Sequence, residues 1–142
     1  MSAELIHHPA LCTLHFPMRL FTVEEANALL PTVRQIVGRI QRGYARVAGA
    51  QEAARQAAAG AALGGGGMEG GARYVAALTT LAESVGQLEA LGVQLKDYER
   101  GLVDFPAMRE GRVVLLCWQM GEGENIGWWH DVEAGFAGRQ PL

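Results

Sequence analysis

The chain has 142 residues, enough for one folded domain, and 49% of them are hydrophobic against 19% charged, values that exclude an intrinsically disordered chain. Twelve basic and 15 acidic side chains give a net charge of −3, so we expect no nucleic-acid partner. No apolar run reaches the roughly 20 residues of a membrane span, and the two cysteines form no CxxC pattern, so we expect a cytoplasmic protein without a membrane partner.

The first 20 residues show no hydrophobic period and contain two prolines, so we interpret residues 1–20 as an N-terminal extension. A helix start follows, because Thr22 and Glu25 have the spacing of a capping box, with a hydroxyl at the N-cap and a carboxylate three residues later. Pro31 interrupts the helical pattern. It predicts either a kink within one helix or a boundary between a short helix and a long one.

Two apolar stripes with the alternating steps of a heptad seam predict an antiparallel helical hairpin over about residues 22–92. Seven glycines between residues 60 and 71 predict a flexible, non-helical tip, and Gly92 is expected to end the second helix. We expect two such hairpins to pair as a homodimer. The stripes are Val33, Val37, Ile40, Tyr44 and Val47 in the first helix, and Tyr74, Leu78, Leu81, Val85 and Leu88 in the second.

After Gly92 the hydrophobic period changes from near 3.6 residues to 2, which predicts strands within residues 93–142. Turn residues at 121–125 predict a β-hairpin between the last two strands, and residues 134–142 are expected to be irregular. The fold class is therefore α+β, a long antiparallel helical hairpin plus a small antiparallel sheet in the C-terminal third. The strand candidates are residues 93–96, 102–105, 112–119 and 126–131.

The side chains that carry chemistry gather in this C-terminal part. Asp104, Cys117, Glu122 and His130 offer carboxylate, thiolate and imidazole ligands, a set that suits one divalent metal, zinc or iron. Because side chains alternate across a strand, Cys117 and His130 share a face only where Cys117 pairs with an even-numbered residue such as His130 or Trp128. The sequence leaves this register open.

The same residues allow other interpretations. Cys117 can be a small buried hydrophobe while His130 forms an ordinary hydrogen bond at the hairpin. Alternatively, the two can form a catalytic dyad oriented by Asp104 or Glu122, which requires a partly exposed thiol whose pKa His130 lowers. Arg139 can bind an anion through its planar guanidinium group, or it can form a structural ion pair with Asp104 or Glu133. Of these two roles we favour the ion pair.

Several short motifs also follow one another in a specific order. They are FTVEEANALLP at 21–31, GLVDFP at 101–106, LCW at 116–118, GE at 121–122, WH at 129–130 and GFAGRQP at 135–141. Their joint order resembles the bacterial DUF2203 family, a domain of unknown function. The resemblance implies one domain over residues 21–142 and implies no activity. The chain departs from the family pattern in its glycine-alanine tip and in its first 20 residues.

No motif has specific catalytic spacing, so the sequence favours a non-catalytic interaction or regulatory module that self-associates through its helical hairpin. The alternative is a small metal- or ligand-binding protein, enzymatic in its stronger form, with its site on the C-terminal hairpin. The register distinguishes them. Cys117 and His130 on one face beside a pocket favour the metal or ligand site, whereas a buried Cys117 with a solvent-facing His130 favours the interaction module.

Overall fold

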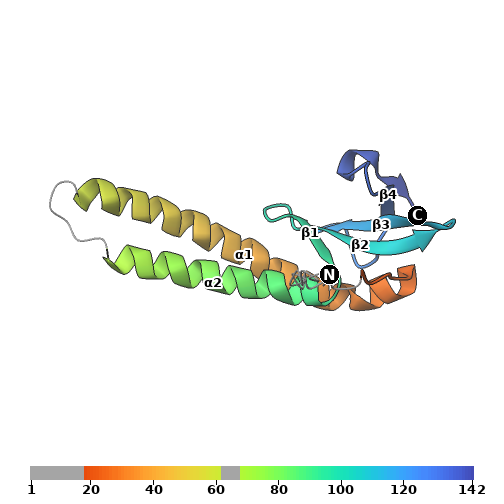
Figure 1. The fold of residues 1–142 in the computed structure, drawn as a ribbon, viewed down its shortest axis with the longest axis horizontal. Helices are drawn as coiled ribbons and strands as arrows, with labels where there is room; N and C mark the ends of the chain where they lie inside the picture. Colours follow the sequence, from red (N-terminus) through yellow and green to blue (C-terminus); the bar gives the residue numbers. More distant parts are fainter. Residues whose placement is uncertain (1–17, 62–67) are drawn as a thin grey trace, which may run out of the picture.

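The computed structural model describes residues 18–61 and 68–142, and it has the predicted α+β class (Figure 1). Helix α1 covers Val23–Ala61 and helix α2 covers Met68–Ala90, and the two pack side by side as an antiparallel hairpin. The predicted N-terminal extension lies outside the described residues as far as residue 17. Within the described ranges, no helix is both long enough and apolar enough to cross a membrane.

The start of α1 confirms the capping box. The Thr22 hydroxyl oxygen accepts a hydrogen bond from the Glu25 N–H at 3.1 Å, and the same hydroxyl donates to the Glu25 carboxylate at 3.2 Å. The helix then continues through Pro31 to Ala61, so there is no helix boundary at this proline. One helix of 39 residues results, longer than the sheet that packs on it (Figure 1).

Both helices extend further into the glycine-rich tip than predicted. Gly60 lies in α1, and Gly70 and Gly71 lie in α2, whereas residues 62–67 of the predicted tip lie outside the described part. A glycine inside a helix costs about 1 kcal/mol relative to alanine. Alanine-rich neighbours and contact between the two helices offset this cost, so glycine content alone overestimated the length of the tip.

Gly92 ends α2 as predicted. Its φ is +84°, its N–H donates to the Glu89 carbonyl at 2.9 Å, and the Val93 N–H donates to the Leu88 carbonyl at 3.3 Å, which is a Schellman motif. An antiparallel five-stranded sheet follows, with its strands side by side in chain order. They are β1 (Gln94–Asp97), β2 (Leu102–Arg109), β3 (Arg112–Gln119), β4 (Trp128–Asp131) and β5 (Gln140–Pro141).

Two parts of the sheet differ from the sequence prediction. Strand β2 runs on to Arg109 because Glu110 and Gly111, with φ of 50° and 78°, form a tight two-residue hairpin turn. The C-terminal tail, predicted to be irregular, contains the 3-10 helix η1 (Phe136–Gly138) and the short strand β5. Strand β5 pairs with β4, so a tertiary contact orders this tail.

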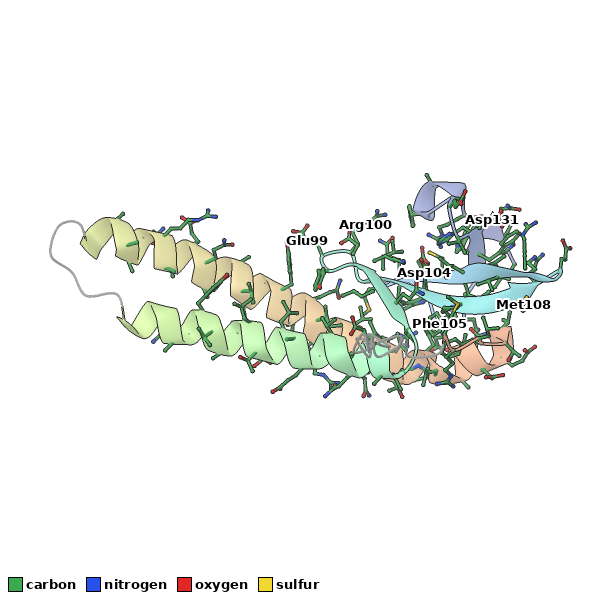
Figure 2. All side chains as sticks on the ribbon, in the orientation of Figure 1. Glu99, Arg100, Asp104, Phe105, Met108 and Asp131 are labelled. Carbon is green, nitrogen blue, oxygen red and sulfur yellow. The ribbon has the colours of Figure 1, made fainter. Side chains whose placement is uncertain are left out.

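One face of the sheet packs against the helices, and the opposite face carries the candidate site described below. Asp104 and Phe105 are neighbours in β2 and lie on opposite sides of the strand, Phe105 toward α1 (Figure 2). The predicted stripes are fully buried only near the sheet, since Leu78 is 39% exposed. The core between helices and sheet contains Leu30, Val33, Val37, Ile40, Leu88, Val103, Phe105, Val114, Leu116, Trp118 and Trp129.

Candidate functional site

Strand pairing brings three of the predicted ligands together on the face of the sheet opposite the helices. Asp104 in β2 lies directly across from Cys117 in β3. Cys117 lies across from Trp128 in β4, and His130 lies across from Leu115, which is one of the registers that place Cys117 and His130 on one face. The cluster therefore depends on three neighbouring strands and a rigid ladder of hydrogen bonds between them.

The three side chains form a compact, buried cluster. A carboxylate oxygen of Asp104, the sulfur of Cys117 and a ring nitrogen of His130 all lie within 4.8 Å of one another. The residues are 2%, 0% and 3% exposed, in that order. Among the described residues no other group of histidine, cysteine, aspartate and glutamate side chains meets this spacing. Imidazole, thiolate and carboxylate are ligand types that transition metals bind in proteins, so this cluster could hold a metal ion.

Both ring nitrogens of His130 have defined partners. Nδ1 lies 2.8 Å from the backbone carbonyl oxygen of Asp131, so Nδ1 carries a hydrogen and donates it. Nε2 lies 3.1 and 3.2 Å from the two carboxylate oxygens of Asp104. Nε2 thus faces the carboxylate at hydrogen-bond distance. The backbone contact fixes the ring so that Nε2 points toward the carboxylate and the thiol.

The Cys117 thiol stays protonated at neutral pH, and a protonated thiol is a poor nucleophile. Burial raises its pKa to about 12, and the nearby Asp104 carboxylate acts in the same direction. His130 directs Nε2 at Asp104 and Nδ1 at a carbonyl. The catalytic dyad considered from the sequence needs an exposed thiolate of lowered pKa, so this geometry does not provide it.

Glu122 and Arg139 lie near the cluster but bind each other. The guanidinium nitrogens of Arg139 donate to the two carboxylate oxygens of Glu122 at 2.6 and 2.9 Å, a bidentate ion pair. The guanidinium group also stacks over Trp128 and Phe136 at 4.8 and 4.7 Å from their ring centroids. The structure thus gives Glu122 a different role from the predicted metal ligand. It also gives Arg139 a structural ion pair, but with Glu122 and not with Asp104 or Glu133.

A cavity of about 160 Å³ opens beside the cluster, with Asp104 and His130 in its wall. The other lining residues come from four separate segments, which are β1, β2, β3 and the segment after β4, and sequence reasoning missed them. Leu102 and Leu115 each lie two residues from a clustered side chain in the same strand, whereas Lys96 in β1 carries no such signal. The other lining residues are Lys96, Leu102, Leu115, Val132, Gly135 and Phe136.

A comparison with protein families identifies the chain. The family model described as "Uncharacterized conserved protein (DUF2203)" matches residues 19–142. The chain belongs to the DUF2203 family. No curated protein and no solved structure matches it. The match to DUF2203 covers both helices and all five strands, so it includes the three clustered side chains and the walls of the cavity.

Proposed function

We propose that this DUF2203 protein binds one divalent transition metal, zinc or iron, through Asp104, Cys117 and His130. The observation that carries the proposal is the approach of one carboxylate, one thiol and one imidazole to within 4.8 Å in a buried site. Three polar groups are costly to bury together unless each is well partnered. A metal ion partners all three at once.

The charges of the cluster fit a dication. A thiolate and a carboxylate supply two negative charges, and neutral imidazole supplies none, so a divalent metal leaves the buried site neutral. Metal binding releases the thiol proton of Cys117 to solvent, because sulfur binds a metal as thiolate. The bound metal replaces this proton, which makes affinity rise with pH.

The distances fit a tetrahedral zinc or iron site after small side-chain rotations. Zinc–nitrogen and zinc–oxygen bonds near 2.0 Å and zinc–sulfur bonds near 2.3 Å place ligand atoms about 3.3–3.6 Å apart. The His130 nitrogen and Asp104 oxygen are 3.1 Å apart already. Metal-binding histidines commonly donate their other ring N–H to a carbonyl or carboxylate, as His130 Nδ1 donates to the Asp131 carbonyl. This bond orients Nε2 toward Asp104, where a metal ion would lie between the two groups.

Three protein ligands leave a tetrahedral ion one open position. The cavity beside Asp104 and His130 supports an open metal position that faces this cavity, where water or a small ligand can enter. Three ligands plus an open position are typical of reactive zinc sites, in which the metal lowers the pKa of bound water to about 7. Ligand binding at the metal is therefore part of the proposed function.

The test is the metal content of untagged protein purified without chelator, measured by elemental mass spectrometry. We expect close to one zinc or iron per chain, lost at least tenfold in Cys117→Ser and in His130→Ala. The controls are Cys12→Ser and His15→Ala, which remove the same residue types elsewhere in the sequence and are expected to retain the metal. Circular dichroism confirms that each variant is folded. Metal-free wild-type protein, or metal retained by both cluster variants, would contradict the proposal.

A second candidate function is self-association through the hairpin, supported by an apolar surface on α2. Val75 and Leu78 are 60% and 39% exposed, and Tyr98 is 41% exposed. A groove of about 310 Å³ runs between Leu78 and Tyr98 along α2. Pairing of two hairpins over such surfaces would form a four-helix bundle. Most of this surface lies on α2 and the rest on the turn after β1, away from the metal cluster, so the two functions are compatible.

A further inference from the structure

We infer that the open metal position binds a small carboxylate with a short apolar body, and that Lys96 provides the charge that selects an anion. The inference rests on the proposed metal site and names its ligand class. Three properties of the cavity carry it: its charge, the chemistry of its walls and its size.

The charge of the cavity favours a single negative charge. With a divalent metal, a thiolate and a carboxylate the site itself is neutral, so the neighbouring cation decides the sign. Lys96 lies in the cavity wall and is the only lysine of the chain. It forms no ion pair with any of the described residues, whereas the nearby Arg139 is paired with Glu122. An entering monoanion is therefore attracted to both the metal and an unpaired ammonium group.

The rest of the wall is apolar and requires a hydrocarbon body. Leu102 and Leu115 contribute side chains from β2 and β3, on the same face as the cluster, and both are buried. Val132 and Phe136 contribute from the segment after β4 that covers this face. Phe136 is held in place because the guanidinium groups of Arg100 and Arg139 stack on its ring, at 4.4 and 4.7 Å from the centroid. A purely hydrophilic ligand would leave these walls without contacts.

The size of the cavity limits that body. Its volume is about 160 Å³. An apolar protein cavity of about 150 Å³ holds a benzene molecule, so the cavity accommodates a body of about six heavy atoms. Butyrate and benzoate meet this limit with their carboxylate directed to the metal, and naphthoate exceeds it. Acetate carries the charge but leaves most of the apolar wall uncovered.

The test uses cobalt-substituted protein, because thiolate-bound cobalt(II) has a charge-transfer absorption band and its ligand-field bands respond to a fourth ligand. Acetate, butyrate, benzoate and 2-naphthoate are titrated, with butyramide as the uncharged control. We expect butyrate to bind about tenfold more tightly than acetate, as burial of two further methylene groups predicts. We expect weak binding of naphthoate and none of butyramide.

The role of Lys96 is tested with Lys96→Met, which keeps an unbranched apolar side chain and removes the charge. We expect butyrate binding to weaken three- to tenfold, within the range of a partly exposed ion pair. Arg46→Met removes an equal charge from α1, far from the cavity lining, and is expected to leave butyrate binding unchanged.

The outcomes separate the two proposals. Absence of the thiolate–cobalt band overturns the metal site and the ligand inference with it. A band that is present but unchanged by butyrate and benzoate overturns the ligand inference while the metal site stands. Equal binding of butyramide, or equal weakening by Lys96→Met and Arg46→Met, overturns the selection of an anion by Lys96.

Discussion

The Cys117 thiol shows how burial sets reactivity at the scale of one residue. Its side chain is 0% exposed, and its pKa of about 12 leaves about one thiol in ten thousand ionised at pH 8. A thiol with the ordinary pKa of about 9 is about one-tenth ionised at that pH. A metal ion in the cluster would make this sulfur a thiolate at neutral pH, because its positive charge replaces the proton.

We predict that Cys117 in metal-free folded protein reacts with a thiol reagent at least a thousandfold more slowly at pH 8 than in urea-unfolded protein. Both low thiolate content and low accessibility act in this direction. The measurement uses a Cys12→Ser background, so that one thiol is followed. Rapid reaction of the folded, metal-free protein would show that Cys117 is accessible, and would return the catalytic dyad to consideration.

The same pKa predicts how stability depends on pH. The folded metal-free protein holds the thiol proton up to a pKa of about 12, whereas the unfolded chain releases it near pH 9. The stabilisation from the protonated thiol is therefore complete below pH 9 and is lost as pH rises from about 9 to about 12, by about 1 kcal/mol per pH unit. Urea unfolding at pH 8 and pH 10.5 measures this loss. Between these two pH values the free energy of unfolding of Cys117→Ala is expected to fall less than that of wild type. Equal falls in the two proteins would contradict the raised pKa.

At the scale of elements, the cluster depends on two segments that are not strands. The β3–β4 connection carries Glu122, and the segment after β4 carries Phe136 and Arg139. The ion pair between Glu122 and Arg139 joins them, with side chains 26% and 9% exposed. This pair therefore holds the C-terminal segment over the cavity.

We predict that Glu122→Gln destabilises the protein by about 2 kcal/mol, because it leaves a largely buried guanidinium group without its counter-charge. The measurement is urea unfolding. The matched control is Asp131→Asn, which breaks the pair with Arg112 at 3.0 Å, where the side chains are 57% and 45% exposed. We expect that change to cost less than about 1 kcal/mol. Purely additive effects of Glu122→Gln and Arg139→Gln in the double variant would show that the two groups do not interact.

The elements whose signals are local could be predicted from the sequence. Thr22 and Gly92 define helix ends through contacts within a few residues, and the change of hydrophobic period after Gly92 separates helices from strands. The three clustered ligand types were also visible, because they are rare in an apolar strand context. Glu122 offers the same carboxylate group as Asp104, and only its ion pair with Arg139 distinguishes it from the clustered side chains.

The β3–β4 register could not be predicted, because distant residues contribute to it. The side-chain oxygen of Asn27 accepts a hydrogen bond from the Ile126 N–H at 2.8 Å, and Arg34 donates to the Gly123 carbonyl at 2.8 Å. These bonds tie the β3–β4 connection to α1 across 99 and 89 residues of sequence. Local turn rules contain no information about such contacts, yet a shift of one residue would place Cys117 and His130 on opposite faces.

At the scale of the whole molecule, the hairpin and the cluster are separated by the sheet. Helix α1 packs on one face of the sheet, and the cluster and its cavity lie on the other. The outer half of the hairpin projects well beyond the sheet (Figure 1). Two helices alone bury few of their side chains, which explains why the predicted stripes are buried near the sheet and exposed further along α2.

We predict that the wild-type protein is a dimer in sedimentation velocity and that the double variant Val75→Glu, Leu78→Glu is monomeric. Two carboxylates on the apolar surface of α2 would be desolvated in a paired hairpin, which costs far more than their exposure in a monomer. Ala45→Glu adds a carboxylate to an exposed position of α1 and is expected to remain dimeric. A monomeric wild-type protein would contradict self-association.

Because the sheet separates this surface from the cluster, the double variant should retain the metal content of wild type. Loss of metal on dissociation would instead show that the dimer completes the site.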